Sequence, residues 1–398
     1  MSRSVILLSL VLGLALLPSE VPPAALPLLR QEWGASATAG GWVVSAYQAG
    51  YVLAVLVLLP LTDRVPAERV IVVCSAVMGL AFLLFALLAH DVWSAAALRA
   101  LTGAALAGVY MPGVRVVAHR STPERRGLAV GAFVSIFYLA TSLSFWATGA
   151  LLPLLGWRGA ALLLGAISLL GAPLALLAAR GAASPTGRSA RLRPSVLASL
   201  PVRCVVFGYV GHSWELYVSR GWLPSFLAAL LIARGSDTLA ATAQAGQAAA
   251  LMMSMGTLGV LLGGWVSDRA PRARAALSIA LPCSLLSFAF GWLGGLPWTL
   301  LLGLGMLYGL LLAADSAIYS TAITELPPRE LVGSAQAMQA FLGFLATAVA
   351  PVGAGALLDL GLGWGWVFGL AGAGALLGAL GLLPLARGAR RESRVASY

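Results

Sequence analysis

His212 and Glu215 are an imidazole and a carboxylate three residues apart inside one long apolar run of this chain. In a helix, residues at that spacing lie on the same face. Arg220 follows in the same run. Such a polar face on an apolar helix is expected to look into a cavity, where Glu215 could take up a proton and Arg220 could attract an anion. The alternative is a structural polar network that ties this helix to its neighbours.

Glu20 is a second carboxylate in an apolar run, and it lies between Pro18 and the pair formed by Pro22 and Pro23. These prolines interrupt regular helical hydrogen bonding. A poorly solvated carboxylate at such a break could take up a proton near neutral pH. Two other interpretations of Glu20 are open: a permanent ion pair with an arginine, or a position among the outer lipid headgroups.

Further charged residues occur in other apolar runs. Because a charge inside the bilayer is costly, each is a candidate for function by default. Three acids and three arginines balance within these runs, so internal pairing is expected. The predicted substrate and proton pathway comprises Glu20, Arg99, Arg115, His212, Glu215, Arg220 and Asp315.

The apolar runs that carry these groups make up most of the 398-residue chain, of which 60% is hydrophobic and 10% is charged. A soluble domain needs about a quarter of its residues charged. The runs are long enough to cross about 30 Å of hydrocarbon, and a lipid-exposed backbone has to be helical to satisfy its own hydrogen bonds. The sequence therefore predicts an all-α membrane protein with twelve transmembrane helices. The spans lie near residues 5–28, 39–61, 69–89, 93–118, 126–153, 159–179, 203–232, 244–266, 274–296, 298–323, 331–358 and 364–386.

All 25 basic residues are arginines, and their distribution predicts the orientation. Nineteen lie in segments on the side of the N-terminus, whereas the opposite loops hold only Arg30, Arg158 and Arg234. This positive-inside bias predicts a multi-pass protein of the cytoplasmic (inner) membrane with both termini in the cytoplasm. The arginines form no continuous stripe, so the net charge of +11 does not indicate a nucleic-acid partner.

The longest polar stretch is rich in arginine, glycine and serine, and it predicts a cytoplasmic linker over residues 181–200. The linker separates a six-helix bundle at residues 1–180 from a second six-helix bundle at residues 201–398, which ends in a short cytoplasmic tail. No other segment is long enough to form a soluble domain.

The two predicted bundles share short motifs at a nearly constant offset. Asp63 recurs 205 residues later as Asp268, and each is followed by an arginine. A Gly-Trp pair that begins at Gly156 recurs at Gly363. Because each half has six helices, both copies share one membrane orientation. The pattern predicts a parallel duplication about an axis along the membrane normal, with the substrate site between the halves.

The repeated loops resemble a motif of the major facilitator superfamily, Gly-x-x-x-Asp-Arg-x-Gly-Arg, which follows the second and the eighth helix of that family. The later copy here matches except that Pro271 replaces the second glycine, whereas the earlier copy has Leu59 and Pro66 at the glycine positions. The resemblance covers nearly the whole chain and implies the twelve-helix fold of the family with two gating loops. The implied gating residues are Asp63, Arg64, Gly264, Asp268, Arg269 and Arg272. Alternatively, these loop charges only enforce topology.

A second resemblance is to the proton-coupled drug exporters of the same superfamily. Arg99 with Gly103 is similar to their fourth-helix motif Arg-x-x-Gln-Gly, although Thr102 replaces the glutamine. An acidic residue in the first helix often takes up the coupled proton in those exporters, which implies this role for Glu20. Their fifth-helix signature Gly-Pro-x-x-Gly-Gly is absent, and a similar arrangement begins only at Pro351 in span eleven. The direction of transport is therefore open.

No nucleophile–base pair, phosphate-binding loop or His-rich metal spacing occurs in the sequence, so we expect neither an enzyme nor a cofactor or metal. Cys74, Cys204 and Cys283 lie in apolar runs and are expected to be free thiols. We expect a monomeric secondary transporter in the lipid bilayer that moves a small organic molecule by alternating access, coupled to protons. Two alternatives are open: a carrier for a small anion, as in the cyanate- and nitrate-type branches of the superfamily, and a non-transporting membrane sensor.

Overall fold

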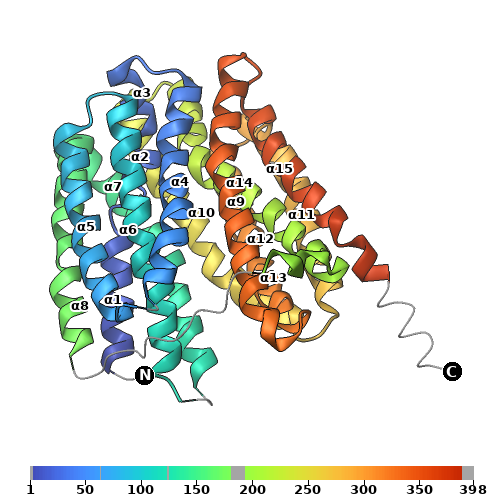
Figure 1. Ribbon diagram of the computed structural model, residues 1–398. Helices are drawn as coiled ribbons and strands as arrows, with labels where there is room; N and C mark the ends of the chain where they lie inside the picture. Colours follow the sequence, from blue (N-terminus) through green and yellow to red (C-terminus); the bar gives the residue numbers. More distant parts are fainter. Residues whose placement is uncertain (1–2, 63, 123–124, 181–192, 388–398) are drawn as a thin grey trace. The chain divides into compact units, whose positions relative to one another are not determined.

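The structure, a computed structural model, describes residues 3–62, 64–122, 125–180 and 193–387. Every regular element in these residues is helical (Figure 1), as the apolar runs predict. The α-helices are α1 (Arg3–Leu16), α2 (Val21–Ala24), α3 (Leu26–Trp33), α4 (Ala37–Leu61), α5 (Ala67–Leu88), α6 (Val92–His119), α7 (Arg126–Leu169), α8 (Gly171–Ala179), α9 (Leu200–Ala233), α10 (Thr238–Ser267), α11 (Arg272–Phe290), α12 (Trp298–Ala314), α13 (Ser316–Glu325), α14 (Val332–Asp359) and α15 (Trp364–Gly381). The short 3-10 helices are η1 (Pro194–Ala198), η2 (Leu293–Gly295) and η3 (Arg329–Leu331).

Eleven helical segments in the described part of the chain are long and apolar enough to cross a membrane. One of them, Ala129–Ala179, has 51 residues. At about 1.5 Å per residue it is more than twice as long as a bilayer core of about 30 Å requires. Non-helical backbone at Gly156 interrupts it, so this segment comprises two crossings. The described helices therefore cross the membrane twelve times, and the predicted number of spans is confirmed.

Gly156 and Gly363 have nearly the same backbone conformation, with φ 63° and ψ 178° at the first and φ 77° and ψ −179° at the second. Only glycine adopts these angles readily, because a Cβ atom would clash with the backbone. A tryptophan follows each glycine and begins the next membrane crossing. The Gly-Trp landmark of the sequence thus marks the same turn in both halves.

The chain forms two compact units. Unit 1 comprises Met1–Ser189 and Leu223–Leu251, and unit 2 comprises Ala190–Trp222 and Met252–Tyr398. The end of α9 and the start of α10 thus belong spatially to unit 1. The division of the sequence at residues 181–200 follows the internal repeat and stays a prediction.

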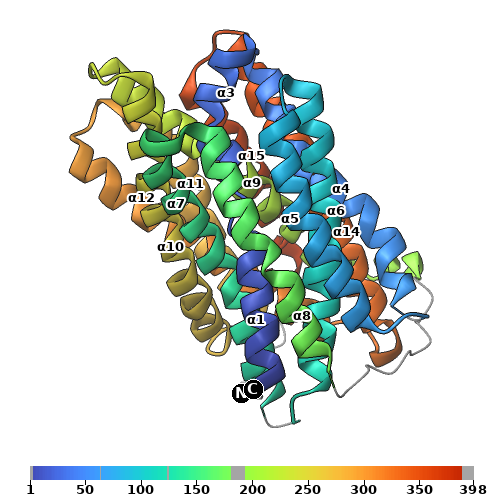
Figure 2. The same ribbon diagram turned by 90° about the vertical axis from the view of Figure 1, so that its left-hand side faces the viewer.

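In unit 1, α6 lies between α4 and α5 (Figure 1). α1 and α8 lie side by side, and α7 packs along α1 and α5 (Figure 2). Glycines allow α4 and α6 to approach closely. A Cβ atom at Gly50 would overlap the carbonyl oxygen of Ala100, and one at Gly103 would overlap that of Tyr47. The backbones of α4 and α6 are therefore in direct contact, as small residues permit between membrane helices.

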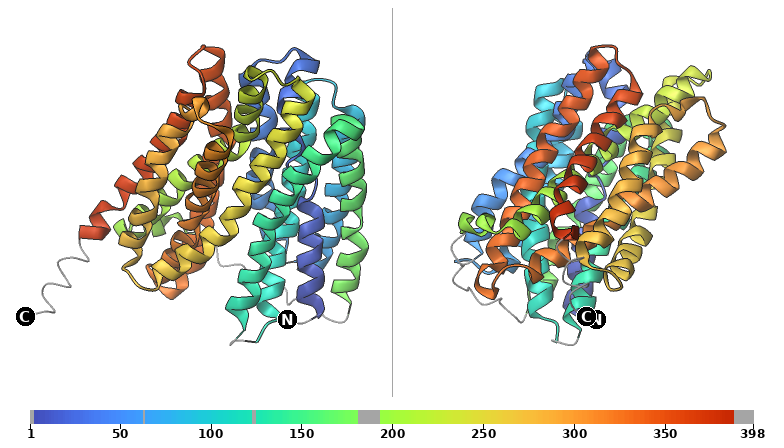
Figure 3. Two further views of the ribbon diagram at one scale, coloured as in Figure 1. Left: turned by 180° about the vertical axis from the view of Figure 1, so that it is seen from behind. Right: turned by 90° about the vertical axis from the view of Figure 1, so that its right-hand side faces the viewer.

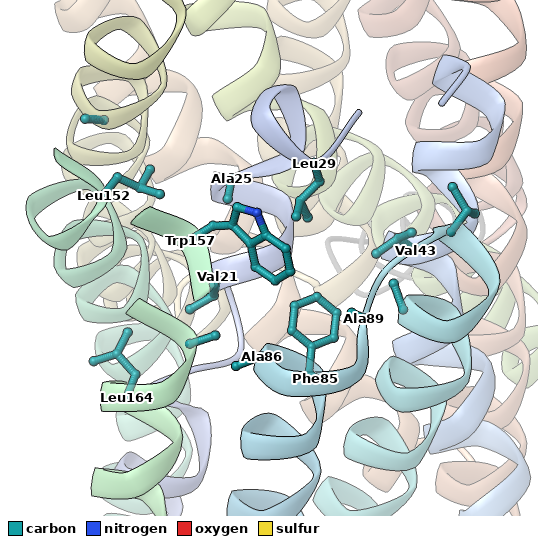
Figure 4. Close-up of a cluster of buried hydrophobic side chains, with 14 residues drawn as sticks. Val21, Ala25, Leu29, Val43, Phe85, Ala86, Ala89, Leu152, Trp157 and Leu164 are labelled. Atoms are coloured by element: carbon teal, nitrogen blue, oxygen red, sulfur yellow. The ribbon is translucent and has the colours of Figure 1, made fainter. Parts of the chain in front are cut away.

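An apolar cluster in unit 1 surrounds the indole ring of Trp157 (Figure 4), whose centroid lies 5.8 Å from that of Phe85. The indole nitrogen donates a hydrogen bond of 2.7 Å to Glu32, and Arg158 pairs with the same carboxylate at 2.6 Å. Partial burial opposes the ionisation of Glu32, but the hydrogen bonds from Trp157 and Arg158 outweigh it and lower the pKa of Glu32 below its ordinary value of 4.5. These contacts tie the end of α3 to the turn at Gly156.

In unit 2, α11 packs against α12 and α15, and α14 contacts α13 and α15 (Figure 3). η1 packs on α14 through buried Val196, and the backbone N–H of Arg193 donates to the Ser334 hydroxyl at 3.1 Å. The last residues of the predicted linker 181–200 are therefore packed in unit 2. Residues 181–192 of that linker lie outside the described residues.

Two membrane spans are interrupted at an acidic residue, one in each unit. In span one, Glu20 separates α1 from α2, whose first turn contains Pro22, as the prolines predict. In span ten, Asp315 separates α12 from α13. A Cβ atom at Gly263 of α10 would overlap the carbonyl oxygen of Ala314, so α10 touches the backbone beside this second break. At Glu20 the interruption leaves backbone polar groups at membrane depth, as the discontinuous helices of transporters do, whereas at Asp315 the backbone stays close to helical and the interruption is slight.

Candidate functional site

His212 and Asp315 form a buried ion pair in unit 2. His212 lies in α9 and Asp315 lies at the break in span ten, and 2.7 Å separates Nδ1 of the imidazole from Oδ1 of the carboxylate. The contact has the distance of an ion pair without the alignment of a hydrogen bond. Both side chains are almost completely buried. The pair therefore ties α9 to the broken span, and the partner of Asp315 is a histidine rather than an arginine.

Glu215 lies one turn after His212 in α9 and is also buried. The hydroxyl of Ser287 in α11 donates a hydrogen bond of 2.6 Å to Oε1 of Glu215. The same serine hydroxyl is 2.5 Å from the hydroxyl of Tyr308 in α12, and that phenol is 2.6 Å from the hydroxyl of Ser219. Four side chains from three helices thus form one continuous hydrogen-bonded chain.

Aromatic rings enclose this network. The rings of Tyr209 and Tyr319 lie 5.8 Å and 5.9 Å from the imidazole of His212, and Phe290 stacks on Tyr308 at 5.1 Å. Tyr319, Phe290 and Tyr308 are fully buried. Polar contacts in such surroundings are electrostatically stronger than in water, and an unsatisfied polar group there is costly.

Cys283 of α11 lies beside Glu215 and adds a thiol to the network. It is a free, buried cysteine like Cys74 and Cys204, as predicted. In the part of the chain that the structure describes, no three His, Cys, Asp or Glu side chains come together as possible metal ligands.

Arg220 lies further along α9, and its guanidinium carbon is 5.7 Å from the centroid of the Tyr217 ring. This distance allows a cation–π contact. Arg220 is half-buried, in contrast to the fully buried His212 and Glu215. The structure thus pairs His212 with Asp315, bonds Glu215 to Ser287 and places Arg220 beside a tyrosine ring.

Glu20 and Arg99 meet at the break in span one, within unit 1. Nη1 of Arg99 donates a hydrogen bond of 3.0 Å to the carbonyl oxygen of Ser19, and the guanidinium carbon lies 4.3 Å above the ring of Tyr47. The backbone N–H of Glu20 donates to the Ser144 hydroxyl at 2.9 Å. Both charged residues are buried. The structure therefore brings the predicted acid of the first span and the predicted arginine of the fourth to one place.

Arg115 lies towards the other end of α6, where Nη1 donates a hydrogen bond of 3.0 Å to the hydroxyl of Thr62. It is 16 residues beyond Arg99 in the same helix, which corresponds to about 24 Å along the axis. The structure thus places Arg115 apart from the break at Glu20.

Arg272 is the centre of the contacts at the later motif loop. Its Nη2 pairs with Glu325 at 2.8 Å, and its Nη1 lies 3.5 Å from the carboxylate of Asp268. The guanidinium carbon of Arg269 lies 4.1 Å above the ring of Trp265. Arg272 therefore links this loop to the end of α13, as a latch would require.

The remaining predicted gating residues are Gly264, Arg64 and Asp63. A Cβ atom at Gly264 would meet no atom within 4 Å, so the glycine is not required for packing. Arg64 is exposed, and Asp63 lies outside the described residues. In unit 1 the pair that corresponds to Arg272 and Glu325 was not anticipated: it joins Arg120 to Glu68 at 2.8 Å.

Sequence analysis also missed Ser287 and Tyr308. Each is a single hydroxyl in an apolar run, and such residues commonly bond their own helix backbone or sit at the membrane interface. The only signal that pointed to them was their position in predicted spans.

Comparison with known proteins identifies the family. The sequence model of the Major Facilitator Superfamily matches residues 8–296. A gallate transporter of Pseudomonas putida is 28% identical over 396 residues, which cover 90% of this chain and 85% of that transporter. A probable sulfoacetate transporter of Cupriavidus necator is 27% identical over 278 residues, which cover 64% of this chain and 62% of that protein.

Solved structures share the fold. A bacterial homolog of the human lysosomal transporter Spinster, in an inward-facing and occupied conformation, aligns over 96% of each chain with a TM-score of 0.75 at 14% identity. The nucleoside transporter NupG aligns over 96% of this chain and 98% of its own, with a TM-score of 0.72 at 15% identity. These relatives and this fold are those of transporters and not of enzymes. Since the family model matches most of its length and its helices have the family's fold, the chain belongs to the major facilitator superfamily.

Proposed function

We propose that this protein is a proton-coupled secondary transporter of a small organic anion. It works by alternating access in the cytoplasmic membrane, with both termini in the cytoplasm. The observation that carries this proposal is the buried network of unit 2, in which Glu215 and Asp315 face one histidine, His212.

The balance of charge supports proton binding at this network. A protonated His212 compensates the charge of Asp315, and Glu215 then remains as a second buried carboxylate. Among the described residues, the cation that faces Glu215 is that same histidine. A net charge in a membrane interior is costly, and uptake of one proton removes it. The network is therefore suited to bind a proton in one state of the carrier and release it in another.

Arg99 of unit 1 supports an anionic substrate. Its guanidinium is buried at a helix break and is held over the ring of Tyr47, which orients its planar face. Guanidinium groups recognise carboxylates and sulfonates through paired hydrogen bonds. Gallate and sulfoacetate, which name two relatives, are both small organic acids. Arg220, half-buried beside Tyr217, is the candidate of unit 2 for binding an anion.

The seven residues predicted from the sequence remain the proposed substrate and proton pathway. The arginine asymmetry between the two sides of the membrane supports the orientation. The loops at Asp268 and Asp63 are proposed as gating loops. The contact between Arg272 and Glu325 supports this role for the later loop.

The test is transport by the purified protein in proteoliposomes. A thermal-shift screen with gallate, sulfoacetate, benzoates, cyanate, nitrate and uncharged metabolites first identifies a stabilising ligand. Labelled ligand is then offered with and without an imposed pH gradient. We expect an organic anion to accumulate against its gradient and a protonophore to abolish the accumulation. If accumulation does not depend on the pH gradient, proton coupling is refuted. If only cyanate or nitrate stabilises the protein, the organic-anion substrate class is refuted. If labelled ligand shows no counterflow, the protein is a sensor and not a carrier.

A further inference from the structure

We propose that Ser219, Tyr308 and Ser287 form an ordered hydroxyl chain that delivers protons to Glu215 inside unit 2. This inference rests on the proposed proton coupling and names the path by which the proton reaches its site. The chain joins α9 to α12, α12 to α11 and α11 back to α9.

The direction of the chain follows from counting hydrogens. Ser287 has one hydroxyl hydrogen and donates it to the carboxylate of Glu215. Its oxygen must then accept from Tyr308, which has only one hydrogen as well. Tyr308 in turn has to accept from Ser219. Every hydroxyl therefore points towards Glu215, which is the arrangement that a proton relay requires before transfer.

The contacts are short and shielded. The three oxygen–oxygen distances are 2.6, 2.5 and 2.6 Å, below the usual 2.7–2.8 Å of such bonds. Ser219, Ser287 and Tyr308 are all fully buried. The ring of Tyr308 packs against Phe290 and Phe368, with centroids 5.1 and 6.4 Å away, so the phenol oxygen is held in place.

The proton balance is simple. In the access state in which water reaches Ser219, a hydronium ion gives one proton to the Ser219 oxygen and leaves as water. Each hydroxyl then passes its own hydrogen to the next oxygen, and one proton leaves Ser287 for the carboxylate of Glu215. Each hydroxyl ends neutral with its hydrogen bond reversed, and Glu215 ends as a carboxylic acid. Neither an oxidant nor a reductant takes part. Reorientation of the three hydroxyls restores the chain.

Other groups around Glu215 set where the proton goes next. His212 faces it from α9, Asp315 from the break in span ten and Cys283 from α11, while Tyr319 lies close by in α13. Ser219 is four residues after Glu215, and His212 is three residues before it. The hydroxyl chain therefore lies on one side of Glu215 along α9, and the pair of His212 with Asp315 lies on the other. A proton can enter from the first and leave by the second.

The test compares two assays on the same proteoliposomes: uptake driven by a pH gradient, and counterflow of labelled substrate at equal pH. Counterflow needs substrate exchange but no net proton movement. Tyr308→Phe keeps the ring and removes only the hydroxyl, and Ser287→Ala removes the next hydroxyl. We expect each to slow driven uptake by at least about tenfold, since a positioned proton carrier is lost, while counterflow stays near wild type. Each variant also leaves a buried neighbour without its hydrogen-bond partner, so a modest fall in melting temperature is expected.

Ser284→Ala is the matched control. Ser284 lies in the same helix as Ser287 and is equally buried, but its hydroxyl donates to the carbonyl oxygen of Ala280 within α11. We expect it to leave both assays unchanged, and we expect Ser287→Thr, which keeps a hydroxyl, to retain driven uptake.

Three results would overturn the hydroxyl chain. The first is driven uptake at the wild-type rate in Tyr308→Phe and Ser287→Ala. The second is an equal loss of counterflow and driven uptake in both variants, which would make the hydroxyls structural. The third is an equal loss in Ser284→Ala. A wild-type protein whose uptake ignores the pH gradient would instead refute the proposed coupling itself, and the relay with it.

Discussion

Arg120 and Glu325 occupy equivalent positions 205 residues apart, yet they carry opposite charges and each closes an ion pair with the start of a neighbouring helix. Arg120 follows α6 and pairs with Glu68 in the first turn of α5. Glu325 ends α13 and pairs with Arg272, the first residue of α11. The repeat therefore retains the contact between these helix ends while its polarity is reversed.

The reversal changes how each pair interacts with the helix dipoles. An acid at a helix start and a base at a helix end are favourable, and the opposite arrangement is unfavourable. The pair of Glu68 with Arg120 has the favourable arrangement and side chains only 5% and 12% exposed. The pair of Arg272 with Glu325 has the unfavourable one and side chains 28% and 48% exposed. The first pair is therefore expected to be the stronger of the two and the second the weaker.

Removal of one partner is expected to affect the two units unequally. Glu68→Gln removes the carboxylate that accepts from the largely buried guanidinium of Arg120 and should lower the free energy of unfolding by about 1–3 kcal/mol. Glu325→Gln breaks an exposed pair and should cost less than about 1 kcal/mol. Thermal unfolding of the detergent-solubilised variants checks this, and equal shifts in melting temperature would contradict it.

Asp268→Asn is expected to slow transport strongly or abolish it, while expression and substrate binding stay close to wild type. The reason is that a gating loop controls exchange between access states, whereas the binding groups set affinity. The carboxylate lies 3.5 Å from Arg272, so its loss weakens one side of the contacts that join this loop to α13. The transport rate is measured in proteoliposomes, and substrate binding is measured as the ligand-induced shift in melting temperature. A wild-type rate would mean that the loop charge serves topology alone.

Glu215→Gln is expected to abolish accumulation driven by a pH gradient and to leave exchange of substrate at equal pH intact, because an amide cannot carry the proton. Glu20→Gln should have a smaller effect, since Arg99 lies at the same helix break and donates to the carbonyl oxygen of Ser19. Both variants are measured against wild type in the same vesicle preparation. Accumulation that survives both substitutions unchanged would exclude these carboxylates as the coupling site.

Because of Glu32, the stability of unit 1 is expected to change with pH in the acidic range. The pKa of Glu32 is lowered in the folded protein below 4.5, so its contribution to stability is fully present above that value and is lost as the pH falls through the folded pKa. Because the carboxylate is partly exposed, we expect a contribution below about 1 kcal/mol. Melting temperatures of wild type and Glu32→Gln should differ at pH 7 and converge towards pH 3. A difference that is constant with pH would contradict the role of this carboxylate.

Gly103→Ala is expected to prevent correct folding or to destabilise the protein by several kcal/mol, because the new methyl group overlaps the carbonyl oxygen of Tyr47 in α4. Gly131→Ala in α7 is the matched control, since a Cβ atom there meets no atom within 4 Å. The control should be neutral or stabilising by up to about 1 kcal/mol, because alanine favours helix more than glycine does. Yield of monodisperse protein and its melting temperature distinguish the two outcomes.

The features that could be predicted from the sequence depend on neighbouring residues along the chain. Length and hydrophobicity determine where the chain can cross a membrane, and prolines on both sides of Glu20 determine where span one breaks. The spacing of His212 and Glu215 places them on one helix face. Gly156 and Gly363 are recognisable as a repeat because a tryptophan follows each, and the positive φ at both positions explains why the glycine recurs.

The partners of these residues could not be predicted, because they depend on how distant helices pack. His212 meets Asp315, which is 103 residues away, and nothing in either local sequence selects that partner. Ser287 and Tyr308 are ordinary residues of membrane helices until packing brings their hydroxyls together. Glu68 and Arg120 lie near loops, where charges are normally solvated, so their burial was not anticipated.

The direct backbone contact between α4 and α6 has a mechanical consequence. Side chains between two helices form a compliant layer, since their rotamers can change as the helices shift. Gly50 and Gly103 remove that layer, so a displacement of α4 is expected to displace α6 with it. The same construction couples α10 to span ten at Gly263. Each unit thus contains a pair of helices that should move as one rigid body. Bending within unit 1 should then concentrate where its backbone leaves the helical conformation, at the turn at Gly156 and at the interruption beside Glu20.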